Sequence, residues 1–420
     1  MAKNIGFVST RFAGTDGVTM EASKWAQVLK SAGHNYFWFA GLLDRSPERS
    51  FLVPEAFFRH EKNLWIDRQI FGHKRRDTAV TDAIFELRTY LKQQLKEFIA
   101  EFNIDLLVAQ NVLTIPMHIP LGIALTELIA ETGIPTIAHH HDFYWERTRF
   151  AVNAVGDYLR MAFPPNLPNI EHVVINSAAQ EELALRTGIS SIIIPNVLDF
   201  DNPPAITRQQ THDFRHEIGL TTEDILILQP TRVVQRKGIE HAIQLVEELN
   251  DPRCKLVISH EAGDEGSDYA EWLKEHARQS GVDLRLLNLR ISDPMNPDVN
   301  RTDLYTLWEI YPHADFITYP SLYEGFGNAF LEAVYFKKPL LINRYAIFVR
   351  DIEPRGFDLI VMDGFLTHRT VERVEEILQS PPRREKMVDT NFEIASRHYS
   401  YRVLRRWLST LLINFFGTDG

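Results

Sequence analysis

Two carboxylates, Glu324 and Glu332, stand eight positions apart around a glycine-rich turn in the second half of the chain. The pattern over residues 315–332 predicts a buried strand, a tight turn with Gly325 and Gly327, and a helix that begins near Gly327. Glycine lets a ligand approach the backbone closely. Unpaired amides at a helix N-terminus favour an anion or a polar oxygen, while carboxylates accept hydrogen bonds from hydroxyl groups. This combination suits a ligand that is part diphosphate and part polyol, as a sugar nucleotide is.

Residues 324–333 have the sequence Glu-Gly-Phe-Gly-Asn-Ala-Phe-Leu-Glu-Ala. This run resembles the E-x7-E element of retaining glycosyltransferases of the GT-B fold, in particular family 4 (glycosyl transferases group 1). We hypothesise that Glu332 holds the ribose diol of a nucleotide-sugar donor. Glu324 would hold the sugar hydroxyls, together with Gly325 and the amides of Phe326, Gly327 and Asn328. The alternative interpretation is an ordinary strand–turn–helix with two solvated glutamates.

Two cations, Arg232 and Lys237, stand five positions apart between a predicted strand and a predicted helix. Departure of a nucleoside diphosphate builds up negative charge, and paired cations can stabilise that charge directly. Arginine suits a bidentate phosphate contact and lysine a point contact. The pair resembles the R-x4-K element of the same family, whereas the adjacent Arg236 is expected to face solvent. Loop cations at a helix start are the alternative interpretation.

Gly14 and Gly17 follow the first predicted strand and precede the first predicted helix. The dinucleotide fingerprint G-x-G-x-x-G is not met, and no acidic residue clearly ends the second strand, which disfavours an NAD-dependent oxidoreductase. The family resemblance implies instead that Gly14 and Gly17 lie in a first loop that borders the donor phosphate and the acceptor.

Three consecutive histidines, His139, His140 and His141, and then Asp142 end a predicted strand of the first half. Neighbouring strand residues point to opposite faces, so only His139 and His141 could share a metal ion, and no third ligand stands at local spacing. We therefore predict no metal site. The resemblance maps the family's His–Asp pair onto His141 and Asp142, beside the transferred sugar, with His140 as the alternative. Strand-end histidines that bond to nearby backbone are the competing interpretation.

Other polar residues also follow predicted strands. Asn111 and His118 could line an acceptor pocket. Arg290 follows a strand of the second half, where loops flank the nucleotide base in the family that this chain resembles.

Residues 42–77 break the regular alternation of strands and helices and are long for a loop. They form either a folded excursion with a solvated basic turn or a wall of the acceptor site. In the second case Lys74, Arg75 or Arg76 would meet an anionic acceptor.

The elements that must position these residues repeat twice along the chain. Short apolar runs alternate with helical patterns, which indicates an α/β fold with parallel, doubly wound sheets. The length of 420 residues favours two domains of roughly 200 residues each. A Pro-, Asn- and Asp-rich stretch predicts a linker, and hence domains over residues 1–198 and 205–399. The resemblance implies two Rossmann-like domains facing each other across a cleft, with a final helix over residues 400–416 packing back on the first.

Composition limits the classes of function. The chain has 45 basic and 56 acidic residues, a net charge of −11, which argues against a nucleic-acid binder. One cysteine excludes an internal disulfide framework and a Cys-based zinc site. No apolar run approaches the length of about 18 residues that would suggest a membrane span. The N-terminus predicts a strand rather than a signal peptide, so we expect a cytoplasmic enzyme.

The resemblance implies a retaining reaction, and with the features above it predicts a metal-independent hexosyltransferase that needs no cofactor beyond its nucleotide-sugar donor. GDP-mannose and UDP-glucose are the favoured donors. The acidic composition favours a hydroxyl of a small soluble acceptor, such as a sugar, polyol or hydroxy acid, over a membrane lipid. A phosphorylase or a nucleotide-sugar epimerase of the same fold is the alternative, and a non-catalytic sugar-nucleotide-binding protein is a third class. The sequence leaves the oligomeric state open.

Overall fold

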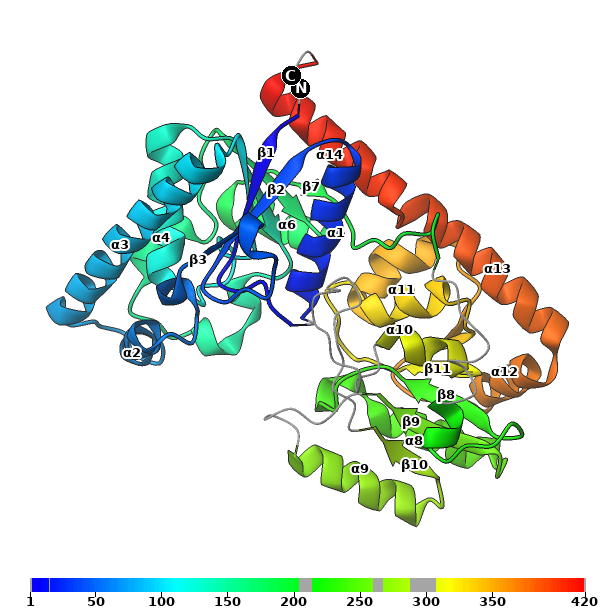
Figure 1. The fold of residues 1–420 in the computed structure, drawn as a ribbon. Helices are drawn as coiled ribbons and strands as arrows, with labels where there is room; N and C mark the ends of the chain where they lie inside the picture. Colours follow the sequence, from blue (N-terminus) through cyan, green and yellow to red (C-terminus); the bar gives the residue numbers. More distant parts are fainter. Residues whose placement is uncertain (1, 15, 204–213, 260–266, 288–306, 419–420) are drawn as a thin grey trace. The chain divides into compact units, whose positions relative to one another are not determined.

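The computed structural model describes residues 2–14, 16–203, 214–259, 267–287 and 307–418. The chain divides into two compact units, each built around a sheet of its own (Figure 1). Unit 1 comprises Met1–Pro195 and Leu404–Gly420, and unit 2 comprises Asn196–Val403.

The described part of unit 1 contains a seven-stranded sheet in the order β3-β2-β1-β4-β5-β6-β7, with every neighbouring pair parallel. Its inner strands are buried along almost their whole length, because helices cover each side of a parallel sheet. The strand order reverses between β1 and β4, so the loops that follow these strands meet at the edge where α/β folds bind ligands. The strands are β1 (Asn4–Val8), β2 (Asn35–Ala40), β3 (Ser50–Leu52), β4 (Leu106–Gln110), β5 (Thr136–His140), β6 (Ile170–Val174) and β7 (Ile192–Ile193).

Helices pack on this sheet through one apolar face each. In Figure 1, α3 and α4 lie on one side of the sheet and α1 on the other. Helix α3 buries six apolar side chains at helical spacing, whereas α4 is buried almost all round. The helices are α1 (Gly17–Ser31), α2 (Glu61–Ile70), α3 (Thr78–Phe102), α4 (Ile119–Thr132), α5 (Gly156–Ala162) and α6 (Ser177–Thr187).

Unit 2 contains, within its described residues, a six-stranded parallel sheet in the order β10-β9-β8-β11-β12-β13. Here the order reverses between β8 and β11. The strands are β8 (Ile225–Gln229), β9 (Cys254–Ile258), β10 (Leu284–Leu286), β11 (Phe316–Tyr319), β12 (Leu340–Asn343) and β13 (Ile360–Met362). The helices are α8 (Ile239–Leu249), α9 (Ser267–Gln279), α10 (Leu307–Ile310), α11 (Asn328–Tyr335), α12 (His368–Gln379) and α13 (Pro381–His398).

The last helix, α14 (Tyr401–Phe416), contains the boundary between the units. Its larger part belongs to unit 1, where Arg405 Nη2 donates to Ser31 Oγ at 2.9 Å. The Lys3 ammonium lies 4.2 Å from the centroid of the Phe416 ring. Within the described ranges, no helix is both long enough and apolar enough to cross a membrane.

The segment over residues 42–77 holds regular structure that the pattern did not reveal, namely β3 and α2. Strand β3 has only three residues at the sheet edge, too few to show an alternation. The basic turn behind α2 is partly structural. Arg76 forms two hydrogen bonds with the Asp157 carboxylate, at 2.7 and 2.6 Å, and a third to Ala154 O at 2.7 Å. Arg76 is therefore a structural residue in this fold, which disfavours it as an acceptor contact.

Candidate active site

In unit 2, two loops meet because β8 and β11 are neighbours in the sheet. One loop runs from residue 230 to 238 and the other from 320 to 327. The backbone N–H of Leu322 donates to Arg236 O at 2.9 Å, which joins the two loops. Gly238 has φ +59°, and a Cβ there would lie 2.6 Å from Pro320 O. The loops approach this closely because position 238 has no side chain.

This junction brings together the predicted cation Lys237 and the predicted carboxylate Glu324. Lys237 Nζ and Glu324 Oε1 form an ion pair that is mostly buried, with side chains that are 10% and 11% exposed, respectively. Arg236 Nη1 lies 3.5 Å from Glu324 Oε2, with a side chain that is 43% exposed. Arg236 thus faces solvent as expected, but it also contacts the site, which the sequence did not indicate.

The electrostatics of this cluster follow from burial and from its excess of cations. Burial lowers the pKa of Lys237, Glu324 opposes that effect, and Arg236 and Arg232 lower the pKa further. Arg232 therefore lies close enough to repel Lys237. Burial alone would raise the pKa of Glu324, but Lys237 and Arg236 outweigh it and hold the pKa below its ordinary value. Glu324 is thus ionised at neutral pH, beside the positive charges of Lys237 and Arg236.

The glycine turn before α11 is held in place by Tyr345. Tyr345 Oη donates to Phe326 O at 2.7 Å. Gly327 caps the helix with φ +113°, and a Cβ there would lie 2.3 Å from Tyr345 Oη. No acceptor in the described ranges takes the backbone N–H of Phe326, Gly327 or Asn328. Three amides are thus open at the positive end of a helix, the arrangement that binds an anion or a sugar oxygen.

Glu332 lies one turn into α11 and is 8% exposed. The fully buried Tyr311 donates from its hydroxyl to Glu332 Oε2 at 2.8 Å. Burial raises the pKa of Tyr311, with Glu332 adding to the effect, so the phenol keeps its proton and remains the donor. At the start of the helix, Asn328 Oδ1 accepts from Asn196 Nδ2 at 2.7 Å. Tyr311 orients Glu332, and no local sequence signal indicated this.

In unit 1, the ends of β4 and β5 carry the second group of predicted residues. His141 Nε2 lies 3.2 Å from Gln110 Oε1, and the His141 backbone N–H donates to Asn111 Oδ1 at 3.1 Å. Asn111 Nδ2 in turn donates to Asp142 Oδ1 at 3.1 Å. The other carboxylate oxygen, Asp142 Oδ2, accepts from Arg147 Nε at 2.7 Å. Asn111 and Arg147 therefore hold Asp142 from both sides.

The three consecutive histidines have different environments. His139 and His140 are buried, whereas His141 is partly exposed. The His139 ring stacks on Trp25 with centroids 4.3 Å apart, and His140 bonds to Thr114 and His172. Burial lowers the pKa of His141 to about 4, so the ring is neutral at pH 7. Of the three, His141 is the one that a ligand can reach.

The expectation that His118 lines an acceptor pocket is wrong. Its side chain is 1% exposed and both ring nitrogens are engaged. Nδ1 accepts from the Leu121 N–H at 3.2 Å as the N-cap of α4, and Nε2 bonds to Glu55 O at 2.8 Å. His118 is a capping residue, and Asn111 organises the His141–Asp142 pair.

Several amides around the first loop of unit 1 already have acceptors. The Gly14 N–H donates to Asp44 Oδ2 at 2.8 Å. Gly17 begins α1, whose next two amides donate to Asp16 Oδ1 at 3.2 Å. A ligand phosphate at Gly14 would have to displace Asp44.

Arg290 and the loop over residues 260–266 lie outside the described residues. Elsewhere in the chain, within the ranges that the structure describes, no group of three or more His, Cys, Asp or Glu residues could hold a metal ion.

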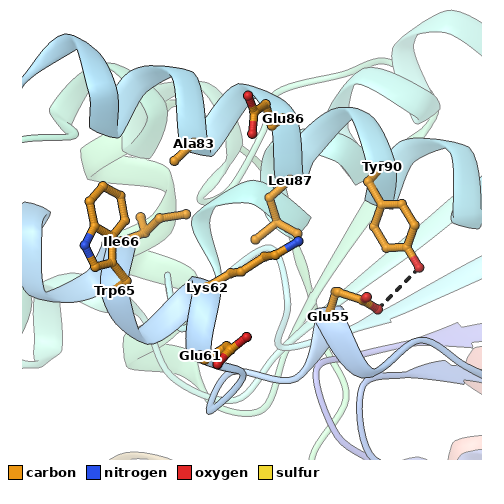
Figure 2. A pocket seen from close by; sticks show the side chains of 9 residues that line it. All are labelled: Glu55, Glu61, Lys62, Trp65, Ile66, Ala83, Glu86, Leu87 and Tyr90. Carbon is orange, nitrogen blue, oxygen red and sulfur yellow. Dashed lines mark hydrogen bonds between the residues drawn. The ribbon is translucent and has the colours of Figure 1, made fainter.

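A groove of about 570 Å³ lies between α2 and α3 in unit 1 (Figure 2). Tyr90 Oη donates to Glu55 Oε2 at 3.3 Å at one end of it. The groove contains none of the predicted site residues, and its three carboxylates outnumber its one ammonium. That charge makes it unfavourable for a diphosphate or a carboxylate ligand. It is lined by Glu55, Glu61, Lys62, Trp65, Ile66, Ala83, Glu86, Leu87 and Tyr90.

Comparison with known proteins decides the family. A model of the family described as "Glycosyl transferases group 1" matches residues 210–393, which include both loops of the unit 2 site. A mannosylglucosylglycerate synthase from Petrotoga mobilis is 34% identical over 383 residues, 85% of this chain and 86% of the relative. Another from Thermotoga maritima is 31% identical over 431 aligned positions, 94% of this chain and 96% of that protein. The chain belongs to the glycosyl transferases group 1 family.

The fold of this glycosyltransferase agrees with that assignment. The crystal structure of a glycosyltransferase from Rickettsia africae superposes with a TM-score of 0.71 at 14% identity, covering 99% of each chain. The GT-B fold expected from the sequence, with two parallel α/β units, is thereby confirmed. As a glycosyltransferase, the protein uses a sugar donor and an acceptor.

Proposed function

We propose that this glycosyltransferase adds a mannosyl unit to glucosylglycerate, with GDP-mannose as the donor. The observation that carries the proposal is the 34% identity, over 85% of the chain, to a protein named mannosylglucosylglycerate synthase. The match spans residues of both units, so it includes the donor side and the acceptor side. GDP-mannose is also one of the two donors that the sequence favours, and glucosylglycerate is a small hydroxy-acid glycoside.

On the donor side, Arg232 and Lys237 stabilise the departing diphosphate, and Arg236 adds a third positive charge. The three cations outnumber the two carboxylates of the donor site, Glu324 and Glu332, so the site has a net positive charge that lowers the energy of the developing negative charge. Because these side chains supply the charge neutralisation, we propose a metal-independent reaction.

The polyol parts of the donor face the carboxylates and the open amides. Glu332, oriented by Tyr311, accepts hydrogen bonds from the ribose diol. Glu324 and the amides of Phe326, Gly327 and Asn328 bind the mannosyl hydroxyls. A bound hydroxyl at Glu324 shares the carboxylate with Lys237, so the same ion pair couples the sugar end of the site to the diphosphate end.

The reaction exchanges one glycosidic bond for another. The bond from mannose C1 to the diphosphate oxygen breaks, and a bond from C1 to an acceptor hydroxyl oxygen forms. We propose that the hydroxyl attacks the face that the diphosphate leaves, which retains the anomeric configuration, and that the leaving phosphate takes the hydroxyl proton. On the acceptor side, His141 and Asp142 stand at the carboxyl edge of the unit 1 sheet.

The test is an assay of purified protein with GDP-mannose and glucosylglycerate, with and without EDTA. The expected product is mannosylglucosylglycerate, identified by mass spectrometry, with the donor's anomeric configuration by NMR and an unchanged yield in EDTA. UDP-glucose and the uncharged glucosylglycerol serve as the donor and acceptor controls. The proposal is overturned if no mannose is transferred from GDP-mannose to either acceptor. It is also overturned if product forms only when inorganic phosphate is present.

A matched pair of variants ties the activity to the site. Lys237→Ala should lower kcat by at least about a hundredfold, the order expected when a charge-stabilising group is removed. Lys274→Ala removes an exposed cation that pairs with Glu271 on α9, so it should keep wild-type kinetics. Equal activity of the two variants would contradict the assigned role of Lys237.

A further inference from the structure

The side chain of Gln110 lies between two histidine rings. Gln110 ends β4 and is paired in register with His139 on β5, and its side chain is 0% exposed. Its carbonyl oxygen Oε1 lies 3.0 Å from His139 Nδ1 and 3.2 Å from His141 Nε2. A carbonyl oxygen has two lone pairs, so it can accept a hydrogen bond from each ring.

In the amide orientation of the structure, Oε1 of Gln110 faces both rings and its Nε2 has no hydrogen-bond partner among the described residues. This orientation determines which nitrogen of each ring carries the proton. A hydrogen bond to a carbonyl oxygen requires an N–H, which places protons on His139 Nδ1 and His141 Nε2. A neutral imidazole has one N–H and one lone pair, so Nδ1 of His141 carries the lone pair. That atom has no partner in the described part of the chain, and the His141 ring is partly exposed. Asn111 holds the His141 backbone and Gln110 contacts its ring, and together these two contacts fix the direction of the lone pair.

We infer that Gln110 is a positioning residue that makes His141 present an unprotonated Nδ1 to a substrate hydroxyl. The inference rests on the proposed function. A nitrogen lone pair accepts a hydrogen bond from a hydroxyl but cannot donate one to a phosphate or a carboxylate. The group that faces His141 is therefore a hydroxyl of the transferred sugar or of the acceptor, and not the diphosphate or the glycerate carboxylate.

The surroundings of His141 keep the ring neutral, so that the tautomer is well defined. Burial is the largest influence and lowers its pKa to about 4. Asp142 and Asp16 act in the opposite direction, and Lys24 on α1 supports the lowering. His139 is the other histidine of the contact, and its own pKa is also lowered by burial. Near pH 7 both rings are neutral, so Gln110 selects between tautomers rather than between charge states.

The first experiment reads the tautomer directly. In protein labelled with ¹⁵N-histidine, long-range ¹H–¹⁵N spectra at pH 7 distinguish protonated from unprotonated ring nitrogens, and His141→Gln assigns the His141 signals. We expect a protonated Nε2 and an unprotonated Nδ1. A protonated Nδ1 would overturn the inference. The measurement needs no substrate and no variant of Gln110, so it stands even if the product is not mannosylglucosylglycerate.

The second experiment changes Gln110 while preserving its shape. A carboxylate between the two rings favours the protonated imidazole, so Gln110→Glu should raise the pKa of His141 by roughly one to three units. The acid limb of the kcat/KM profile should move up by the same amount, because protonation removes the lone pair. Gln93→Glu, an exposed substitution on α3, should leave the profile unchanged. A Gln110→Glu profile that coincides with the wild-type profile would refute the positioning role.

A third substitution identifies the hydroxyl. Gln110→Leu frees the ring to change tautomer and should lower kcat while thermal stabilisation by GDP, measured on the donor side, is retained. A rise in the KM for GDP-mannose would assign the hydroxyl to the sugar, and a rise in the KM for glucosylglycerate would assign it to the acceptor. Unchanged kcat and KM values would contradict the inference.

Discussion

Position 327 in the donor turn tolerates no side chain, because of its positive φ and its contact with Tyr345. The variant Gly327→Ala tests this conclusion. A non-glycine residue held at φ +113° costs about 1–3 kcal/mol in backbone strain. The new methyl would also lie 2.3 Å from Tyr345 Oη, so either the turn or the tyrosine must shift. Overpacking of this kind costs about 1–3 kcal/mol. Together these terms predict a destabilisation of roughly 2–6 kcal/mol.

Two further variants separate the terms. Gly364→Ala introduces a methyl at φ +78° with no atom within 4 Å, so it should show backbone strain alone. Combining Gly327→Ala with Tyr345→Phe removes the clashing hydroxyl and should recover part of the loss. Tyr345→Phe alone loses the hydrogen bond to Phe326 O, a loss of about 0.5–1.5 kcal/mol.

Calorimetric unfolding and GDP titration measure the two consequences. The transition midpoints of the variants are compared directly, because a protein with two units does not unfold as a single two-state system. Gly327→Ala should melt below Gly364→Ala and bind GDP at least about tenfold more weakly, a change of about 1.4 kcal/mol, because a shift of the turn also moves Glu332, the proposed ribose contact in α11. The reasoning is refuted if Gly327→Ala melts like Gly364→Ala and binds GDP like the wild type.

Three other outcomes follow from the structure. Glu324→Gln should lower kcat more than it weakens GDP binding, whereas Glu332→Ala should chiefly weaken GDP binding. Steady-state kinetics measures kcat, and titration calorimetry measures GDP binding. Wild-type values for both variants would contradict the assignment of these residues to the donor site. Acidification should destabilise unit 1, because burial lowers the folded pKa of five of its histidines, to about 4 for His118, His141 and His172, against an unfolded value of about 6.5. Between these pKa values the unfolded chain binds more protons than the folded chain, so the free energy of unfolding falls as the pH drops through 6.5. At pH 5.5 the loss is about 1.4 kcal/mol per histidine. A melting temperature that stays constant from pH 7 to 5.5 would disprove this prediction. The histidines concerned are His118, His139, His140, His141 and His172. Arg76→Ala should lower the melting temperature through loss of its hydrogen bonds to Asp157 and Ala154 while the KM for the acceptor is kept; a raised KM with unchanged stability would favour an acceptor contact instead.

Most of the fold could be predicted because its signals are local. Apolar runs of four or five residues, separated by helical patterns, are visible without knowledge of any distant residue. The elements that escaped prediction were short or partly polar. Strand β3 has three residues, and α2 mixes charged and apolar positions within ten residues. His118 shows the same limit, since its spacing after a strand suggested a ligand contact but its role is to cap α4.

The candidate site likewise contains residues that the sequence could predict and residues that it could not. The residue types of the donor turn, from Glu324 to Glu332, were recognisable because they are contiguous. Their partners were not, because Tyr311 and Tyr345 come from other elements and have no characteristic spacing to the turn. Arg236 and Lys237 both contact Glu324, although Glu324 stands 87 positions after Lys237 in the sequence.

The sequence by itself determined the alternation of strands and helices, the two α/β units and the glycine turns, because each depends on neighbouring residues. Only the tertiary structure decided which loops meet, since that depends on β8 pairing with β11 and on β4 pairing with β5. These pairings place Lys237 on Glu324 and Gln110 beside His141. Charge state and tautomer then follow from burial and from those contacts, which no local pattern encodes.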